Sequence, residues 1–524
     1  MGMAWPATGN LFFLVFVALV PLLYVENIIH NNPDKYKAFH FFNYALITFL
    51  TWNIITTWWI YHATAEGMLM AVFLNSIFMA TVVFLFHFTK KTLGEKRGYI
   101  SLVVYWLAFE YLHMDWDLSW PWLTLGNVFA QNIQWVQWYE FTGVFGGSLW
   151  VLVVNILFFL ILREKYILEK NLKDILPKFI TLCIIFFAPV LMSKIMYNNY
   201  REKGTPADVV VVQPNIDPYN EKFNGLTPDE QLEKMNDLAA SAIDTGTDYV
   251  VFPETALPQG MWENELADSR TVEDIRNFIS RYPKLHYVTG LVSYRKYGMT
   301  DKLSATARPL HNAAGHYDVY NAAMQIDHSA EIQLYHKSKL VPGVEKMPFP
   351  SILGFLEAYA LDMGGMTGSH GVDEERGVFA SVDGKLKAAP VICYESIYAE
   401  YLGGYVKNGA NIIFIITNDG WWKNTPGYKQ HLQYARLKAV ANRRSIARSA
   451  NTGISCFINQ RGDIQQATGW WEPAVIRQKI NANDEITFYA KHGDYIARAA
   501  FFIAILILLS AIAFSLNKTK QRLG

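Results

Sequence analysis

Seven long apolar runs limit what this chain can fold into, since six of them crowd the first two hundred residues and one lies near the carboxyl end. A helix that crosses a membrane needs ~20 mostly apolar residues, within a range of roughly 17–25. The second, third, sixth and seventh runs meet that length, and aromatic flanks extend the other three into the membrane interface. We therefore predict about seven spans. The runs cover residues 10–24, 39–61, 68–88, 99–112, 147–162, 175–192 and 499–516.

The first run has an alternative interpretation as a signal peptide, but it lacks the basic leader and the small-residue cleavage site of one.

The charge balance and the cysteine content argue against two classes of protein. Lys and Arg together number 46, as do Asp and Glu, so no basic excess favours a nucleic-acid partner. Three cysteines in 524 residues argue against a disulfide scaffold.

Basic clusters orient the predicted spans, because cytoplasmic loops carry an excess of Lys and Arg. With all the clusters in the cytoplasm, residues 197–494 lie on the opposite, extracytoplasmic side. The amino terminus and the Trp-rich stretch 113–141 lie there too. Trp and Tyr favour headgroup depth, so we predict that this stretch is an interfacial segment of the outer leaflet. The clusters are Lys90, Lys91, Lys96 and Arg97; Arg163, Lys165, Lys170 and Lys173; and Lys518, Lys520 and Arg522.

The predicted domains are a helix bundle over residues 1–200, with its interfacial loop near 113–145, an α/β domain over 205–488, a span over 495–517 and a cytoplasmic tail over 518–524. In the middle region, apolar runs such as "ADVVVVQPNI" and "ANIIFIITNDGWW" alternate with helical patterns such as "TPDEQLEKMNDLAASAID". Continuously apolar strands between helices are typical of an α/β domain with a sheet buried on both faces. "VYNAAMQID" and "EIQLYHKSKLVP", joined by a His-Ser turn, predict a hairpin.

Three chemically capable side chains follow strands of this domain. Glu254 follows "YVVFP", Lys337 follows "IQLYH" and Cys393 follows "APVI". Ligands of such sheets bind beyond the carboxyl ends of the strands. Each residue has an ordinary alternative, as a solvated loop carboxylate, a surface ammonium or a buried core thiol. Their occurrence at equivalent strand ends of one domain favours a shared site.

Together the three side chains could carry out acyl transfer through a thioester. A thiol with a pKa of ~8.5 is mostly protonated at neutral pH, and a nearby ammonium or helix amino terminus favours the thiolate. We expect Lys337 to supply the ammonium. We expect the helical segment "SIYAEYLGGYVKNG" after Cys393 to supply the helix amino terminus. Glu254 would take up and return protons, and Lys337 would also stabilise an oxyanion.

Two other chemistries lack their motifs. No G-x-S-x-G elbow follows a strand, which disfavours a Ser-His-Asp hydrolase. Neither C-x-x-C nor H-E-x-x-H occurs, so we predict no zinc site and no cofactor.

The residues resemble the carbon–nitrogen hydrolase (nitrilase) superfamily, whose members carry a Glu-Lys-Cys triad in that chain order on an α-β-β-α sandwich. "FPETALP", "YHKSKLVPGVE" and "VICYE" are similar to its three motifs. The bundle before the domain, the span after it, and the stretches "SWPWLTLGN" and "EFTGVFGGSLWVLVVN" extend the likeness over nearly the whole chain. In this it is similar to the membrane-embedded branch of the superfamily, the bacterial apolipoprotein N-acyltransferases.

The resemblance implies a role for each matching residue. Glu254 is the general base, Lys337 the oxyanion stabiliser and Cys393 the acylated nucleophile. Three residues match the family's additional acidic residue and the pair after its cysteine, namely Glu345, Tyr394 and Glu395. Three aromatic residues stand near the family's acyl site and are predicted to bind substrate, namely Phe223, Trp421 and Trp422.

Three departures from the family pattern stand out. "PGVE" replaces "P-F-G-E" in the loop of Glu345, so we expect that loop to differ in shape, and Phe223 stands where Trp is frequent in the family. The family has eight spans with a cytoplasmic start, whereas "MGMAWPATGN" is similar to the link between its first two spans. We therefore expect a further helix before residue 1.

The resemblance implies transfer of an acyl chain from a membrane phospholipid, through a Cys393 thioester, to the N-terminal amine of a diacylglyceryl-cysteine apolipoprotein. This is the last step of bacterial lipoprotein maturation. The expected enzyme is a monomer of the inner membrane with its catalytic domain on the periplasmic side, and it has no nucleic-acid partner. In that oxidising compartment Cys393 must stay unpaired, so we predict no disulfide with Cys456.

Two alternatives remain open from the sequence. A membrane-tethered nitrilase-like amidase would use the same triad, but a soluble substrate gives no reason for a helix bundle. A transporter or receptor with an inactive nitrilase-like domain would need charged residues within its spans, and Glu110 is the one hint of that.

Overall fold

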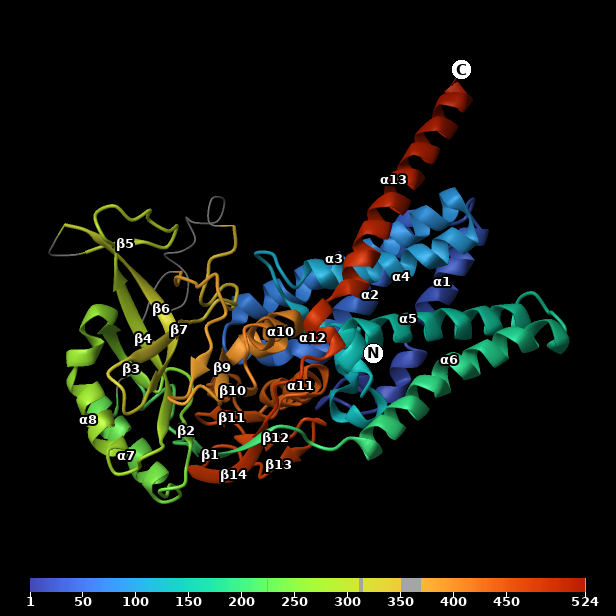
Figure 1. Ribbon diagram of the computed structural model, residues 1–524. Coiled ribbons are helices and arrows are strands. Elements are labelled where there is room, and N and C mark those ends of the chain that lie inside the picture. Colours follow the sequence, from blue (N-terminus) through green and yellow to red (C-terminus); the bar gives the residue numbers. More distant parts are fainter. Residues whose placement is uncertain (224, 311–313, 350–368, 524) are drawn as a thin grey trace. The chain divides into compact units, whose positions relative to one another are not determined.

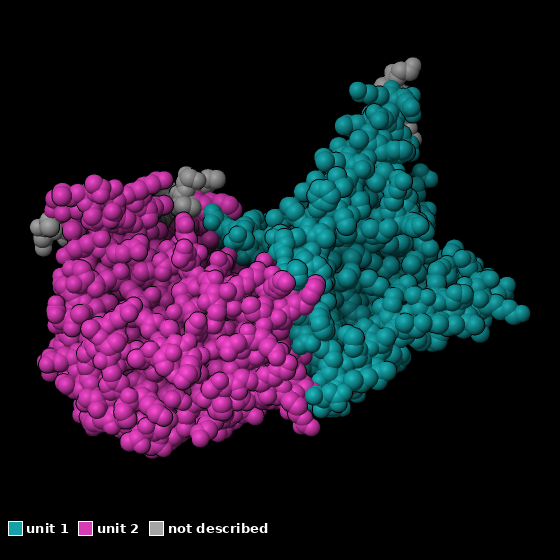
Figure 2. All heavy atoms as spheres, in the orientation of Figure 1, with its two compact units in different colours: residues 1–199, 492–524 teal, residues 200–491 magenta. Residues whose placement is uncertain are grey.

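The computed structural model describes residues 1–223, 225–310, 314–349 and 369–523, and the chain forms two compact units (Figures 1 and 2). Unit 1 contains residues 1–199 and 492–524, and unit 2 contains residues 200–491.

Each of the seven predicted runs overlaps one of the long helices of unit 1, although the first run reaches its helix only from residue 20 on (Figure 1). These helices are α1 (Val20–Asn31), α2 (Ala38–Thr57), α3 (Ala65–Leu93), α4 (Glu95–Leu112), α5 (Tyr139–Tyr166), α6 (Leu172–Asn199) and α13 (Tyr495–Leu523). In the described part of the chain, six helical segments are long and apolar enough to cross a membrane. These are Phe12–Asn31, Ala38–His62, Ala65–Leu93, Tyr139–Tyr166, Leu172–Asn199 and Tyr495–Gln521. The fourth run forms α4, whose 18 residues begin with Glu95, Lys96 and Arg97, and it is not among the six.

The Trp-rich stretch packs inside unit 1. It forms three short 3-10 helices, η4 (Pro121–Leu123), η5 (Leu125–Gln131) and η6 (Ile133–Trp135). The Trp122 ring is fully buried and lies 4.9 Å from that of Trp59. Glu110 accepts a hydrogen bond from the Leu125 amide at 2.7 Å, which ties η5 to α4. These large rings bury apolar surface against the helices of unit 1. The place of this stretch at the membrane interface stays a prediction.

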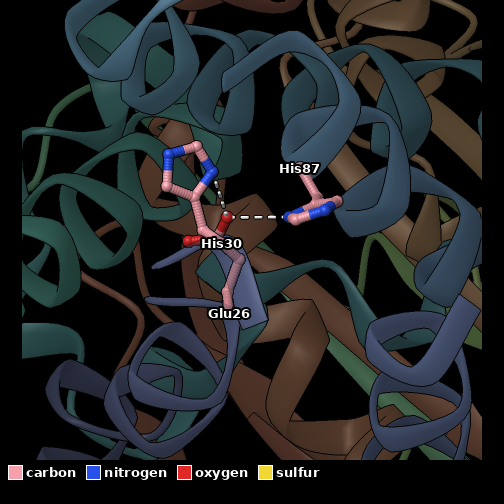
Figure 3. A group of neighbouring side chains, drawn as sticks. All are labelled: Glu26, His30 and His87. Carbon is pink, nitrogen blue, oxygen red and sulfur yellow. Dashed lines mark hydrogen bonds and ion pairs between the residues drawn. The ribbon is translucent and has the colours of Figure 1, made fainter. Parts of the chain in front are cut away.

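Unit 1 also buries a cluster of ionisable side chains. Glu26 and His30 lie one turn apart on α1 and meet His87 of α3 (Figure 3). Glu26 Oε1 lies 2.8 Å from His87 Nδ1 and 3.9 Å from His30 Nδ1, and these three atoms could hold a metal ion. Lys90 Nζ, however, already pairs with Glu26 Oε2 at 2.5 Å, so an added cation would meet a like charge. We interpret the cluster as a polar clamp between α1 and α3.

Replacing Glu26 by Gln should destabilise unit 1, because it leaves the Lys90 ammonium buried without its counter-charge. Removing one partner of a buried ion pair costs about 3–5 kcal/mol, so Glu26→Gln should lower the Tm measured in detergent. The double variant Glu26→Gln/Lys90→Met removes both charges and should recover most of the loss. A single variant as stable as the wild type would contradict the clamp.

Two facing β-sheets form the centre of unit 2. The first has the order β14-β1-β2-β4-β6-β5, with β3 paired to β4 and β7 paired to β6. Its strands are β1 (Thr205–Gln213), β2 (Tyr249–Val251), β3 (Leu257–Trp262), β4 (His286–Lys296), β5 (Arg308–Pro309), β6 (His316–Ile326), β7 (Ile332–His336) and β14 (Ala474–Ala482). The second has the order β13-β12-β11-β10-β9-β8. Its strands are β8 (Phe379–Ala380), β9 (Lys387–Ile392), β10 (Ile412–Thr417), β11 (Ile446–Ala450), β12 (Cys456–Ile458) and β13 (Ile464–Gln465).

Helices cover the outer face of each sheet, which makes unit 2 an α-β-β-α sandwich and confirms the predicted fold (Figure 1). Helices α7 (Pro228–Ala240) and α8 (Arg270–Ile279) pack on the first sheet, and α10 (Ala399–Lys407) and α11 (Pro426–Asn442) pack on the second. The sheets touch through the Tyr249 and Phe414 rings, 5.0 Å apart. Ser449 Oγ also donates to the Val212 carbonyl oxygen at 2.8 Å. Apolar strands buried on both faces are what this layering requires.

Strand direction brings the predicted side chains to one edge. β2 runs parallel to β4, β4 antiparallel to β6, and β6 antiparallel to β7 in the predicted hairpin. β2 and β7 therefore point the same way, and the residues that follow them, Glu254 and Lys337, come to the same end of the first sheet. Cys393 follows β9 of the second sheet.

Candidate active site

A buried ring of four side chains forms the centre of the site. Lys337 Nζ donates to Glu254 Oε1 at 2.9 Å and to Glu345 Oε1 at 2.7 Å. Asn321 Nδ2, from β6, donates to the same two oxygens at 2.8 and 3.0 Å. The other oxygen of Glu254 accepts from the backbone amide of Asn418 at 3.1 Å. Two carboxylates therefore share two donors.

Burial and charge act against each other in this ring. Burial alone would lower the pKa of Lys337, whose side chain is 1% exposed, but Glu254 and Glu345 raise that pKa well above its ordinary value. Burial would likewise raise the pKa of Glu345, yet Lys337 and His370 hold it below the usual range. Lys337 is thus an ammonium that faces an ionised Glu345.

Cys393 directly follows β9 and begins the short 3-10 helix η9 (Cys393–Ile397). Its φ of +47° lies in the left-handed region, which is uncommon for a residue other than glycine. Burial and the Glu254 carboxylate raise the pKa of its thiol well above the ordinary value, although Lys337 and a hydrogen bond with Thr417 oppose them. The expected influence of Lys337 in favour of the thiolate is therefore outweighed, and the resting group is a neutral thiol. The helix α10 begins only at Ala399, six residues further on.

Glu395 joins the two sheets beneath the site. It is fully buried, and its Oε1 accepts from the Tyr335 hydroxyl at 2.6 Å and from the Ser338 amide at 2.7 Å. Its Oε2 accepts from the Ile392 amide at 2.8 Å. One carboxylate thus fixes the loop after Lys337 to the end of the strand that presents Cys393.

The remaining predicted residues lie around this centre. Tyr394 is buried with its ring 5.3 Å from that of Tyr398. Phe223 is half-buried, with the Lys222 ammonium 5.9 Å from its ring. The Trp421 carbonyl oxygen accepts from a tyrosine hydroxyl at 2.9 Å, and the Trp422 ring lies 5.6 Å from His431. Substrate binding by these aromatic residues stays a prediction.

The loop that departs from the family pattern still delivers Glu345. Gly343, which replaces the family's Phe position in "PGVE", adopts a φ of +79°. The turn closes with the Gly343 amide bonded to the Lys346 carbonyl oxygen at 2.8 Å. The Val341 amide donates to Glu345 Oε2 at 2.8 Å, which orients the carboxylate towards Lys337.

A polar network under Cys393 was not predicted from the sequence. His431 Nε2 lies 3.1 Å from the Cys393 carbonyl oxygen, and Ser396 Oγ donates to that oxygen at 2.7 Å. His431 Nδ1 lies 3.0 Å from Asp419 Oδ1, and Arg448 donates to Asp419 Oδ2 at 2.6 Å. Asn321 was also missed. A polar residue within the apolar run "VYNAAMQID" is the signal that could have identified it.

His336 precedes Lys337 and lies between two carboxylates. Its Nε2 is 2.7 Å from Glu263 Oε1, and its Nδ1 is 3.1 Å from Asp373 Oδ2. Burial alone would lower the pKa of His336, but Asp373 and Glu263 outweigh it and raise that pKa above its ordinary value. The protonated ring therefore stabilises the strand end that carries Lys337.

This raised pKa predicts how stability depends on pH. A group whose pKa is raised by folding stabilises the protein below its unfolded pKa, about 6.5 for His, and that contribution is lost as the pH rises through the folded pKa. The difference in Tm between the wild type and His336→Gln should therefore be largest below about pH 6.5 and should shrink at higher pH. His316→Gln, at a half-buried strand position, is the control. A difference that grows with pH would refute this assignment.

The fold and the buried Glu-Lys-Cys arrangement define a protein of the carbon–nitrogen hydrolase class, and the profile of that family matches residues 208–488. The profile of the apolipoprotein N-acyltransferase N-terminal domain matches residues 1–157. The apolipoprotein N-acyltransferase of Chlorobaculum tepidum is 30% identical over 97% of this chain and 93% of its own length. That of Geobacter metallireducens is 26% identical over 98% of this chain and 93% of its own. The chain therefore belongs to the apolipoprotein N-acyltransferase family. The six long apolar helices among its described residues fit a membrane protein.

Proposed function

We propose that this protein transfers an acyl chain from a membrane phospholipid to the N-terminal amine of a diacylglyceryl-cysteine apolipoprotein. The observation that carries the proposal is the buried Lys337 ammonium bonded to Glu254, at strand ends that also present Cys393, in a chain of this family. The relatives from Chlorobaculum tepidum and Geobacter metallireducens are apolipoprotein N-acyltransferases, which supports an apolipoprotein as the acceptor.

In the first half-reaction the Cys393 sulfur attacks the ester carbonyl carbon of the phospholipid. The neutral thiol gives its proton to Glu254 as the carbon–sulfur bond forms. Lys337 stabilises the negative charge that develops on the carbonyl oxygen. The carbon–oxygen bond then breaks, protonated Glu254 returns the proton to the leaving oxygen, and a lysophospholipid departs. Cys393 is left as a thioester.

In the second half-reaction the α-amine of the apolipoprotein attacks the thioester carbon. Glu254 accepts a proton from the attacking nitrogen, and Lys337 again faces the oxyanion. The carbon–sulfur bond breaks, the sulfur regains its proton, and an amide remains on the acceptor. The donor ester already carries the acyl group in transferable form, so the sequence of steps balances without a further reactant.

We also propose that the enzyme is a monomer of the bacterial inner membrane with unit 2 on the periplasmic side. The positive-inside rule requires α4 to cross the membrane. If α4 did not cross, the basic clusters that follow α3 and α5 would lie on opposite sides. Its buried side chains, among them Trp106 and Glu110, support a place within the bundle.

A tethered amidase and a transporter with an inactive domain are the competing proposals. The amidase would use the same buried ring but would hydrolyse a small amide and would not retain a lipid acyl group on Cys393. The inactive domain has no use for a strained cysteine facing a Glu–Lys pair, because strain of that kind persists at functional sites.

Intact mass measurement tests the first half-reaction. Purified protein incubated with phospholipid in detergent should gain the mass of one acyl chain, and Cys393→Ala should gain none, since it lacks the attacking sulfur. Cys456→Ala removes another buried free thiol of unit 2 and is the matched control, which should acylate like the wild type. A wild-type protein that never acquires an acyl group would sink the proposal.

A further inference from the structure

A second buried lysine adjoins the site and has no role in the steps above. Lys222 lies in the turn between β1 and α7 and is 3% exposed. Its Nζ donates to the Glu254 backbone carbonyl oxygen at 3.2 Å and to Thr255 Oγ1 at 2.6 Å. Both acceptors belong to the turn that carries the proposed general base.

That turn is strained. Thr255 has a φ of +45°, which a β-branched residue rarely adopts. The turn at Glu254 and Thr255 also lies very close to the backbone of Gly290 in β4. A Cβ added at Gly290 would lie 2.5 Å from the Thr255 nitrogen and 2.8 Å from the Glu254 Cα. A strained backbone persists only where the surrounding contacts over-determine it. Lys222 supplies two of those contacts.

The surroundings of Lys222 fix it in place without neutralising it. Gln231 of α7 donates from Nε2 to the Lys222 carbonyl oxygen at 2.8 Å, which ties this turn to the helix. Among the described residues, Glu254 is the charged group that acts on the Lys222 ammonium. Burial lowers the pKa of Lys222 to about 8, and Glu254 opposes that shift.

The Lys222 ammonium compensates a buried negative charge of the site. The ring buries two carboxylates, Glu254 and Glu345, against the single charge of Lys337. Uncompensated charge is costly in a buried site. Lys222 brings a second positive charge next to Glu254, so that the two ammonium groups of Lys337 and Lys222 match the two carboxylates of Glu254 and Glu345 in number.

We propose that Lys222 is a positioning residue for the general base, an inference that rests on the proposed function. Its ammonium holds the turn at Glu254 and Thr255, and so keeps the Glu254 carboxylate in its bonds to Lys337 and to the Asn418 amide. Lys222 acts through Glu254 and not on the acyl group. Its loss should therefore lower the rate constant of Cys393 acylation and leave the apparent affinity for phospholipid nearly unchanged.

The test is the single-turnover rate of Cys393 acylation by phospholipid in mixed micelles, followed by intact mass over a range of pH. No acceptor amine is present, so its titration does not enter. The wild-type rate should fall as the pH rises past about 8, where Lys222 loses its charge. The Lys337 ammonium and the Cys393 thiol, both with pKa values raised well above the ordinary, titrate at higher pH.

Three variants sharpen the test. Lys222→Met should acylate about ten- to a hundredfold more slowly at pH 7, as expected for losing hydrogen bonds from a charged group, and should lack the alkaline fall. Lys222→Arg keeps the charge and should extend activity to higher pH. Lys234→Met is the matched control, since Lys234 of α7 donates to the Asn215 carbonyl oxygen at 3.3 Å and not to the turn of Glu254. It should follow the wild type.

The outcomes separate the two proposals. If the wild type acylates and a folded Lys222→Met matches it at every pH, the positioning role is wrong. If Lys222→Met loses its thermal transition, Thr255→Val replaces it, because valine keeps the β-branched shape and removes one acceptor of the ammonium. Slower acylation in Thr255→Val supports the role, and an unchanged rate overturns it. A wild type that never acylates refutes the proposed function instead.

Discussion

The ion pair between buried Lys337 and its two carboxylates sets the conditions for the rest of unit 2. Glu254 and Glu345 are both bonded to it, and they lie close enough to share Asn321 as well. Two buried carboxylates can stay ionised together only if opposite charge touches them, because removing a charge from water is expensive. The carboxyl ends of β2 and β7 must therefore meet beside Asn321, in the middle of β6. Glu395 binds the second sheet to the same point through the amides of Ser338 and Ile392.

Backbone strain marks both proposed reacting groups. Cys393 itself has a left-handed φ, as does Thr255 directly after Glu254. Each position is held by polar contacts from neighbouring segments. Ser396 and His431 lie at the Cys393 carbonyl oxygen, and Lys222 bonds the turn of Glu254. Strain at two such positions in one site is expected where side-chain placement matters more than local backbone preference.

The sequence predicts the parts of this fold that depend on local pattern. Apolar runs mark the helices of unit 1, and strand ends mark Glu254, Lys337 and Cys393, because a strand boundary fixes where a side chain emerges. What the pattern could not predict depends on tertiary burial. The Trp-rich stretch turns inward because its rings find partners in distant helices, such as Trp59 for Trp122. The thiol stays neutral because burial outweighs the ammonium that a sequence reading emphasises. Lys222 and Asn321 are ordinary polar residues until the fold brings them to Glu254.

Two buried clusters in this chain differ in the number of carboxylates that each lysine ammonium faces, and this number affects reactivity. In unit 1 the Lys90 ammonium forms an ion pair with the Glu26 carboxylate, and the two charges cancel. In unit 2 Lys337 serves two carboxylates, so a negative charge remains for a neighbour to compensate. In the proposed first half-reaction Cys393 gives its proton to Glu254 and an oxyanion forms beside Lys337, so the negative charge moves from the carboxylate to the carbonyl oxygen while the total charge stays constant. The protein therefore needs little reorganisation at that step, which is the condition under which fixed charges stabilise a transition state most.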